Sequence, residues 1–160
     1  MIRKANIDDL ARIMDIERVG FSEAEAATEA AMKERIEKIS DTFFVVEEQG
    51  DVRAFVVGNV MTKRYITDDQ FETLQANQPI GGHQSVLSIA VDPAYRSRGY
   101  GSQLLTHIEA VAREAARESV SLTCLARLIG YYEKQGYVNE GASSSTHGGE
   151  QWFNLVKPLS

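Results

Sequence analysis

The sequence predicts a single α+β domain built around one mixed β-sheet. Its 160 residues fit one domain, residues 1–160, because separate hydrophobic cores rarely form in so short a chain. With 43% hydrophobic and 25% charged residues, the composition is typical of a globular protein with a real core. Helical and strand patterns are mixed, and the second half alternates strand, helix, strand and helix, which favours the α+β class.

The first half is expected to contain two helices followed by a β-hairpin. Asn6 can cap a helix over residues 7–19, where apolar side chains recur near helical spacing. The Ala/Glu-rich stretch 23–39, with apolar residues along one face, predicts a second helix. Residues 42–48 and 52–60 are rich in β-branched and aromatic residues on either side of a turn, which indicates a hairpin.

The second half is expected to start with a long connection. Residues 62–82 are polar and irregular, and long loops of this kind often shape a binding site. The apolar run 86–91 predicts a buried central strand, and an amphipathic helix follows it. The remaining elements are expected as a strand at 120–125, a helix at 128–135 and final strands at 137 and 152–156.

Charge and cysteine content narrow the function classes. The net charge of -6 gives no general attraction for nucleic acid or anionic membranes, so we expect neither partner, whereas a cationic amine suits an acidic surface. One cysteine cannot form an intrachain disulfide, and the N-terminus has no long apolar stretch, so we expect a cytoplasmic protein. The three histidines and single cysteine show no metal-ligand spacing, so no metal is expected.

An anion-binding turn is predicted between the central strand and the following helix. Gly99 and Gly101 lack a Cβ, so the backbone can turn sharply and present several N–H groups beside the positive end of a helix dipole. Arg96 and Arg98 can bind phosphate oxygens, and Ser102 can donate another hydrogen bond. An isolated turn of this kind is as often a solvated surface loop; the strand before it and the helix after it favour a pyrophosphate site.

This stretch resembles the pyrophosphate loop of the GNAT superfamily of acyl-CoA-dependent N-acetyltransferases. Arg96-Ser97-Arg98-Gly99-Tyr100-Gly101 matches the family pattern Arg/Gln-x-x-Gly-x-Gly/Ala. The hairpin at 44–60, the segment with Ile66-Thr67 and the strand 88–91 resemble its arylalkylamine (serotonin) N-acetyltransferase branch and bacterial relatives. The resemblance implies a mostly antiparallel mixed sheet flanked by helices, with a splayed central strand pair that binds acetyl-CoA. The cofactor-binding residues it implies are Ile89, Ala90, Val91, Arg96, Ser97, Arg98, Gly99, Tyr100, Gly101 and Ser102.

A second resemblance concerns the acid of the reaction. Residues 130–137 are similar to the Phe/Tyr-Tyr-x-x-x-Gly-Phe/Tyr signature of the family, and Tyr132 takes the position of the tyrosine that protonates the departing sulfur. Without the resemblance, a packed aromatic residue would be the commoner interpretation. Many members carry Asn seven residues earlier, where this chain has Leu125. Cys124 is interpreted as a buried packing residue, and the resemblance implies direct transfer without an acetyl-enzyme.

The general base departs from the family pattern. The positions that carry it in relatives are Ser85 and Leu87 here, so the paired histidines of the vertebrate serotonin enzymes are missing. His83 lies just upstream and could act through water, and His147 lies in a polar Gly-rich loop. A solvated surface residue is the commoner interpretation of either histidine, and His147 is the better candidate.

Phe21 and Tyr65 are the candidates for amine recognition, because aromatic faces hold aryl rings and cations. Each could equally be an ordinary packing residue. The function we expect is transfer of acetyl from acetyl-CoA to a primary amine of a small molecule, either an arylalkylamine or a polyamine. Two alternatives remain open, namely acetylation of a protein lysine or N-terminus and a non-catalytic acyl-CoA sensor. A homodimer is compatible with such a fold.

Overall fold

The computed structural model describes residues 1–159. The α-helices are α1 (Leu10–Gly20), α2 (Glu29–Lys38), α3 (Tyr100–Glu114) and α4 (Ile129–Lys134). The strands are β1 (Ile2–Lys4), β2 (Phe43–Glu48), β3 (Asp51–Val57), β4 (Val60–Met61), β5 (His83–Val86), β6 (Ser88–Val91), β7 (Ser119–Cys124), β8 (Val138–Ala142) and β9 (Phe153–Pro158).

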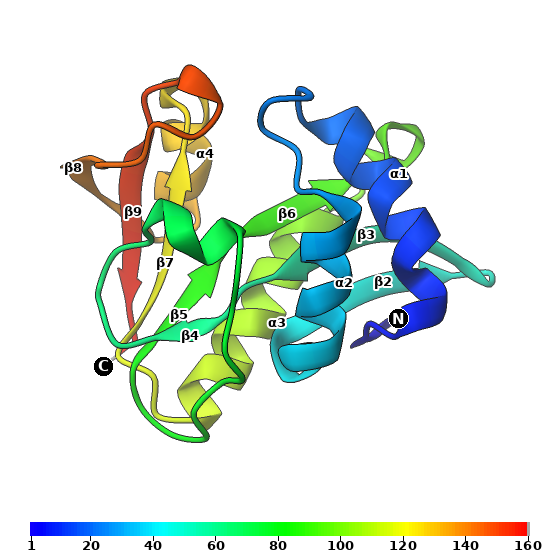
Figure 1. Cartoon of the computed structure of the whole chain (residues 1–160), viewed down its shortest axis with the longest axis horizontal. Coiled ribbons are helices and arrows are strands. Elements are labelled where there is room, and N and C mark those ends of the chain that lie inside the picture. Colours follow the sequence, from blue (N-terminus) through cyan, green and yellow to red (C-terminus); the bar gives the residue numbers. More distant parts are fainter. Residues whose placement is uncertain (160) are drawn as a thin grey trace.

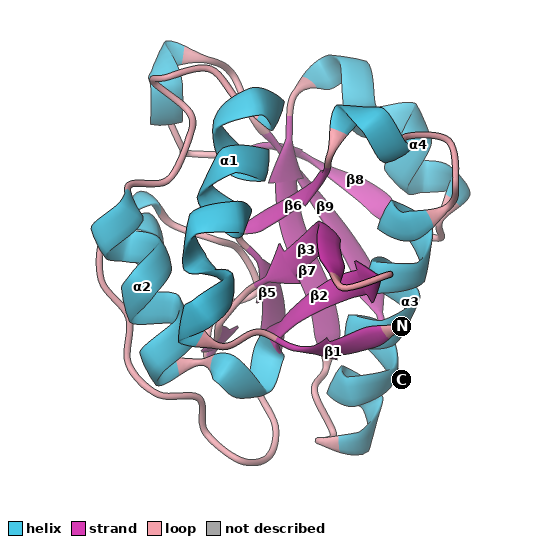
Figure 2. Cartoon of the chain, turned by 90° about the vertical axis from the view of Figure 1, so that its right-hand side faces the viewer, coloured by secondary structure: helices cyan, strands magenta, loops and turns pink. Residues whose placement is uncertain are grey.

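The strands form two sheets with helices on both sides. One sheet has the order β1-β2-β3-β6 and the other β4-β5-β7-β9-β8, and every pairing is antiparallel except β5 with β7. Figure 2 shows α1 and α2 on one side of the strands and α3 and α4 on the other. The predicted fold class, a mostly antiparallel mixed sheet flanked by helices, is confirmed. From the sequence we expected one mixed sheet, and the structure divides it into two sheets that part at the central strand.

The break in the central strand is built by a close backbone crossing. A Cβ placed on Gly58 would lie 1.8 Å from the carbonyl oxygen of Ser85, so only glycine fits where β3 ends. Immediately after this crossing, Leu87 N–H donates to the Val57 carbonyl at 2.8 Å. The chain therefore leaves one sheet at Leu87 and joins the other, which divides the predicted strand 86–91 into β5 and β6.

This division produces the predicted splay between two neighbouring strands. β5 runs parallel to β7 in the register Gln84↔Val120 to Val86↔Leu122. Beyond Leu87, β6 pairs with β3, whereas the end of β7 pairs with β9. β6 and the end of β7 therefore separate, as the green and yellow strands of Figure 1 show. Because β6 stays paired with β3 and β7 stays paired with β9, a gap can open between β6 and β7 in the middle of the domain.

The second helix is shorter than predicted, because it starts at Glu29 rather than near Glu23. Thr28 caps it by accepting a hydrogen bond from Ala31 N–H at 3.1 Å. The preceding Ala27 N–H donates to the Glu17 carboxylate at 2.8 Å, a tertiary contact in place of a helical one. Residues 22–28 therefore cross the end of α1 as an irregular segment. The predicted first helix is confirmed, with Asn6 capping the turn that leads into it.

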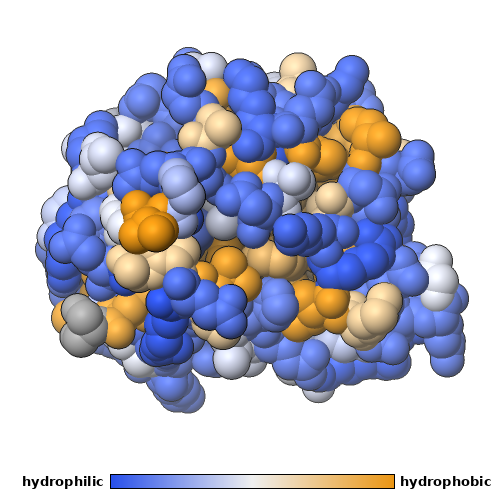
Figure 3. Space-filling view, turned by 90° about the horizontal axis from the view of Figure 1, so that it is seen from below, coloured by the Kyte–Doolittle hydropathy of each residue, from blue (hydrophilic) through white to orange (hydrophobic). Residues whose placement is uncertain are grey.

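The hydrophobic core fills both sides of the strands. One cluster lies between the sheet and α1 with α2, around Ile13, Met32 and Phe55, and the other lies beneath α3, around Leu104 and Leu122. On the face in Figure 3, hydrophobic residues of the described chain form small separate groups among hydrophilic ones. Within residues 1–159, no helix has the length and apolar character needed to cross a membrane.

Candidate active site

A cavity of about 720 Å³ opens where β6 and β7 separate. Its walls come from the two splayed strands, the end of α1 with the segment 22–28, α2, residues 68–72 of the long connection, residues 128–132 at the start of α4 and the segment before β9. The lining residues on which the argument depends are Glu17, Phe21, Arg35, Asp68, Phe71, Ile89, Thr123, Cys124, Tyr132, His147 and Trp152. The cavity thus combines the predicted cofactor strand with residues from distant parts of the sequence.

The backbone of β6 offers free hydrogen-bonding groups on the open side of the splay. Asp92 N–H donates to the Arg53 carbonyl at 2.8 Å, which sets the register of the ladder with β3. In an antiparallel pair every second residue bonds to its partner, so Ala90 turns its backbone groups toward β3. Ile89 and Val91 turn theirs away from β3, where no strand pairs with β6 within residues 1–159. An extended ligand can bind there as an added strand would.

The predicted anion-binding turn lies at the start of α3. Ser97 and Gly99 have φ angles of 65° and 79°, in the left-handed region that reverses the chain sharply. α3 begins at the next residue, so its unpaired N–H groups and the positive end of its dipole face the turn. Arg96 and Arg98 are exposed beside it. The arrangement suits a phosphate group.

Gly101 was predicted to help the chain turn sharply, but it lies after the turn. It lies inside the first turn of α3 with ordinary helical geometry, so it does not produce the sharp reversal. A Cβ at Gly101 would lie 3.3 Å from the Tyr131 hydroxyl, so a larger residue would require the end of the Tyr131 side chain to shift slightly. The predicted donor Ser102 accepts a hydrogen bond from Gln135 Nε2 at 2.9 Å and lies 3.3 Å from the same Tyr131 hydroxyl.

Arg53 is a basic residue near the turn that the sequence interpretation missed. Its guanidinium carbon lies 4.1 Å from the centre of the Tyr95 ring, and that of Arg98 lies 5.2 Å from the same ring. Arg53 also donates to the Tyr100 hydroxyl at 3.4 Å. Arg53 comes from β3, which is why only the folded chain brings it to the loop. Stacking on one tyrosine holds both arginines beside the turn.

Tyr132 lies on the cavity wall with most of its ring in the core. It is 7% exposed, and it packs edge-on against Tyr131 and Tyr137 at 5.1 and 5.9 Å between ring centres. Burial raises the pKa of the Tyr132 phenol, and Cys124 and Tyr131 raise it further. A phenol with a raised pKa stays protonated near neutral pH. Tyr132 can therefore donate a proton to a group within the cavity.

Cys124 also faces the cavity but is a poor nucleophile. It is buried, and burial raises the pKa of its thiol to about 11. Since the thiolate is the reactive form, a thiol that remains protonated near neutral pH reacts slowly. The cysteine therefore contributes packing next to Tyr132 rather than covalent chemistry.

His147 lines the cavity where the segment before β9 meets the segment 22–28. Its Nε2 donates to the Glu25 carbonyl at 2.8 Å, which joins the segment before β9 to the segment 22–28. Because a carbonyl only accepts, the neutral imidazole keeps its lone pair on Nδ1. The ring stacks on Phe71 at 4.9 Å, and Trp152 Nε1 donates to the His147 carbonyl at 2.7 Å. These contacts hold the histidine at the cavity wall.

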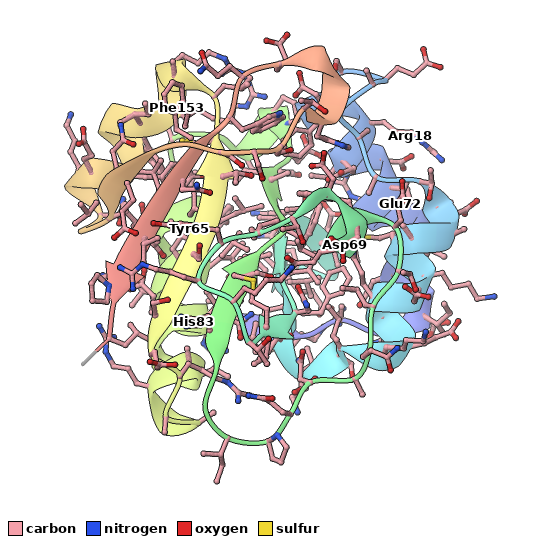
Figure 4. All side chains as sticks on the ribbon, turned by 60° about the vertical axis from the view of Figure 1, so that its left-hand side comes forward. Arg18, Tyr65, Asp69, Glu72, His83 and Phe153 are labelled. Carbon is pink, nitrogen blue, oxygen red and sulfur yellow. The ribbon has the colours of Figure 1, made fainter. Side chains whose placement is uncertain are left out.

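Two predicted residues lie elsewhere. His83 stands at the start of β5, where its Nδ1 lies 2.7 Å from Ser119 Oγ, and it does not line the cavity. Tyr65 is 37% exposed, and its hydroxyl donates to Glu140 at 2.7 Å. In Figure 4 both lie away from Glu72, which does line the cavity. The other predicted aromatic residue, Phe21, follows α1 and lines the cavity as expected.

Several cavity residues were not predicted from the sequence. Glu17 is 2% exposed; its carboxylate accepts hydrogen bonds from Ser88 Oγ at 2.6 Å and Ala27 N–H at 2.8 Å. Arg35 from α2 and Phe71 from the long connection also line the cavity. In the sequence, Glu17 and Arg35 look like solvated helical charges, and the only signal was their position on the apolar faces of their helices.

The sequence profile described as the acetyltransferase (GNAT) family matches residues 10–137, most of the chain. The chain belongs to this family. The predicted family is thereby confirmed, and the matched region includes the splayed strands, the anion-binding turn and Tyr132.

Individual relatives agree with this membership. The probable glucosamine 6-phosphate N-acetyltransferase 2 of Oryza sativa subsp. japonica is 35% identical over 66 residues, which are 41% of this chain and 39% of the rice protein. The structure of the GNAT-like decarboxylase GphF with isobutyryl-CoA is similar with a TM-score of 0.85, 18% identity and full coverage of both chains. The ribosomal-protein-S18-alanine N-acetyltransferase of Escherichia coli has a TM-score of 0.74 and 20% identity, covering 100% of this chain and 94% of its own. At these identities the two structures show the shared fold alone.

Proposed function

We propose that this GNAT family protein transfers the acetyl group of acetyl-CoA directly to a primary amine of a small molecule. The observation that carries the proposal is the alignment of three features along one path. The turn before α3 suits a phosphate, the outward backbone groups of Ile89 and Val91 suit an extended arm, and the cavity beyond them holds Tyr132. A pantetheine chain has the length and the amide groups to follow such a path.

The residues of the chain divide the chemistry between them. Acetyl-CoA supplies the acyl group as a thioester, which a free amine can attack. Tyr132 holds the proton that the departing sulfur needs, because its phenol is neutral and faces the cavity. His147 accepts the proton of the amine at Nδ1, directly or through a water molecule. Cys124 forms no covalent link to the acyl group, because its thiol stays protonated.

The contact between the segment 22–28 and the segment before β9 favours a small amine over a protein substrate. An extended peptide needs an open groove, whereas the bond from His147 to Glu25 ties together the two segments that would form its walls. In the cavity wall, Phe21, Phe71 and Trp152 supply aromatic faces for an aryl group or a cation. An arylalkylamine fits these faces, and a polyamine fits the carboxylates that also line the cavity.

The first experiment measures acetyl-CoA binding by calorimetry and CoA release with a panel of phenethylamines, tryptamine, polyamines and a lysine peptide. Gly101→Glu puts a bulky anion within the turn, so we expect acetyl-CoA binding to weaken by at least about tenfold. The matched control is Ala110→Glu, which adds the same charge to an exposed position of α3 and should leave binding unchanged.

The outcomes separate the alternatives. CoA release with a small amine, together with loss of binding only in Gly101→Glu, supports the proposal. Binding without turnover across the whole panel would favour an acyl-CoA sensor, and turnover of the peptide alone would favour a protein acetyltransferase. No binding of acetyl-CoA by the wild type would overturn the proposal.

A further inference from the structure

Arg35 is a buried cation with almost none of its hydrogen-bonding capacity used. It lies on the buried face of α2 with 1% exposure, and it lines the cavity. Nη2 makes one long hydrogen bond, 3.5 Å to the Phe71 carbonyl, and Nη1 has no partner within residues 1–159. A guanidinium carries five N–H donors, so most of this one is unsatisfied.

The carboxylates of Glu17 and Glu34 attract the charge of Arg35 without a direct contact. Burial lowers the pKa of Arg35, and Glu17 and Glu34 oppose that shift by attraction. Glu17 is occupied by Ser88 and Ala27, and Glu34 by the Leu74 N–H at 2.9 Å and by Lys38 at 3.1 Å. Neither carboxylate forms an ion pair with Arg35 within residues 1–159. A buried charge without a direct partner is costly, and stability alone does not call for it.

The position of Arg35 in the cavity wall allows its unpaired N–H groups to bind the acceptor molecule. The cavity extends from the splay of β6 and β7, beside Tyr132, to α2, which carries Arg35. An acceptor whose amine lies at the splay therefore points its other end toward α2. Carboxylate and phosphate groups match the planar fork of a guanidinium and bind it through paired hydrogen bonds.

We propose that the acceptor amine also carries an anionic group, a carboxylate or a phosphate, and that Arg35 binds this group through its unpartnered Nη1. The proposal rests on the acetyl transfer proposed above and narrows its substrate class. An arylalkylamine with a carboxylate at the far end of its ring, such as 4-(2-aminoethyl)benzoate, would satisfy both the aromatic walls and Arg35, whereas a simple arylalkylamine would leave the guanidinium unpaired.

The test compares amines that differ only in the anionic group: 4-(2-aminoethyl)benzoate with phenethylamine, and O-phosphoethanolamine with ethanolamine. For the wild type we expect at least one anionic member to be preferred in kcat/KM by about ten- to a hundredfold. The first pair reports on carboxylate and the second on phosphate. Arg35→Met should remove the preference by raising KM for the anionic amine while kcat changes little, because Arg35 is distant from the reacting atoms.

Two further variants separate binding from folding. Arg117→Met removes another buried arginine, one that bonds to the Gly81 carbonyl outside the cavity, and should keep the preference. Arg35→Lys keeps the charge without the fork, so it should retain part of the preference even where Arg35→Met folds poorly. Equal or better use of the uncharged partners by the wild type would overturn the proposal, and so would an unchanged preference in Arg35→Lys together with Arg35→Met.

A binding measurement keeps the inference independent of turnover. Calorimetric titration of the wild type with the same amines should show binding of an anionic member that weakens about tenfold or more in Arg35→Met. If no amine is acetylated but this difference is seen, the transfer reaction is contradicted and the anion site stands. If amines are acetylated but no anionic member binds better, the anion site is contradicted and the transfer stands.

Discussion

Replacing Tyr132 with phenylalanine tests the proposed acid without disturbing the fold. The substitution removes one oxygen, and the ring keeps its contacts with Tyr131 and Tyr137. The hydroxyl has no protein hydrogen bond within residues 1–159, so its loss leaves no buried partner unsatisfied. We therefore expect the melting temperature to change by no more than about 2 °C, the effect of roughly 0.5 kcal/mol.

The effect on catalysis should be much larger. Loss of a positioned general acid lowers kcat by about 100- to 10,000-fold, which corresponds to roughly 2.7 to 5.4 kcal/mol in the activation barrier. The assay is CoA release at saturating amine, with the acetyl-CoA dissociation constant measured in parallel and expected to stay the same. A decrease in kcat of less than about fivefold would refute the assignment of Tyr132 as the acid.

Tyr137→Phe is the matched control for Tyr132→Phe. Its hydroxyl donates to the buried carboxylate of Glu109 at 2.9 Å, beneath α3 and away from the cavity. Removing this charge-assisted bond should cost about 1.5 to 3 kcal/mol and lower the melting temperature, while kcat of the folded protein stays unchanged. The two variants are thus expected to show opposite signatures, one in rate and the other in stability.

Three further predictions follow from the same structure. His147→Ala should lower kcat by about 100-fold or more, as loss of a positioned general base does, and an unchanged kcat would exclude His147 as the base. Gly58→Ala places a Cβ 1.8 Å from the Ser85 carbonyl, so thermal unfolding should show a loss of at least about 3 kcal/mol, and an unchanged melting temperature would contradict the crossing. Cys124 should react slowly with iodoacetamide at pH 8 and faster as the pH approaches its pKa of about 11, and Cys124→Ser should keep turnover; rapid labelling at pH 8 would contradict its burial.

The sequence alone was sufficient for the fold class and most of the elements. Apolar periodicity located the helix after the central strand, and Gly99 located the sharp turn before it, because both depend on local chain geometry. The position of Tyr132 came from a resemblance to a family motif. Helix boundaries were less certain, as the irregular segment 22–28 shows, because Ala and Glu favour a helix that a contact with Glu17 overrides.

The charged part of the cavity wall could not be predicted in the same way. Glu17, Arg35 and Phe71 are far apart in the sequence, and a charged residue in a helix is usually solvated, so no local pattern distinguishes these charges from surface ones. For the same reason, the sequence could not show which of the two histidines, His83 or His147, lies at the cavity. Both lie in polar sequence, yet the fold places His147 at the cavity and His83 beside Ser119. Local sequence therefore determined which elements form and where the sharp turn before α3 lies, whereas the crossing at Gly58 and the long-range packing of α2 decided which charges line the cavity.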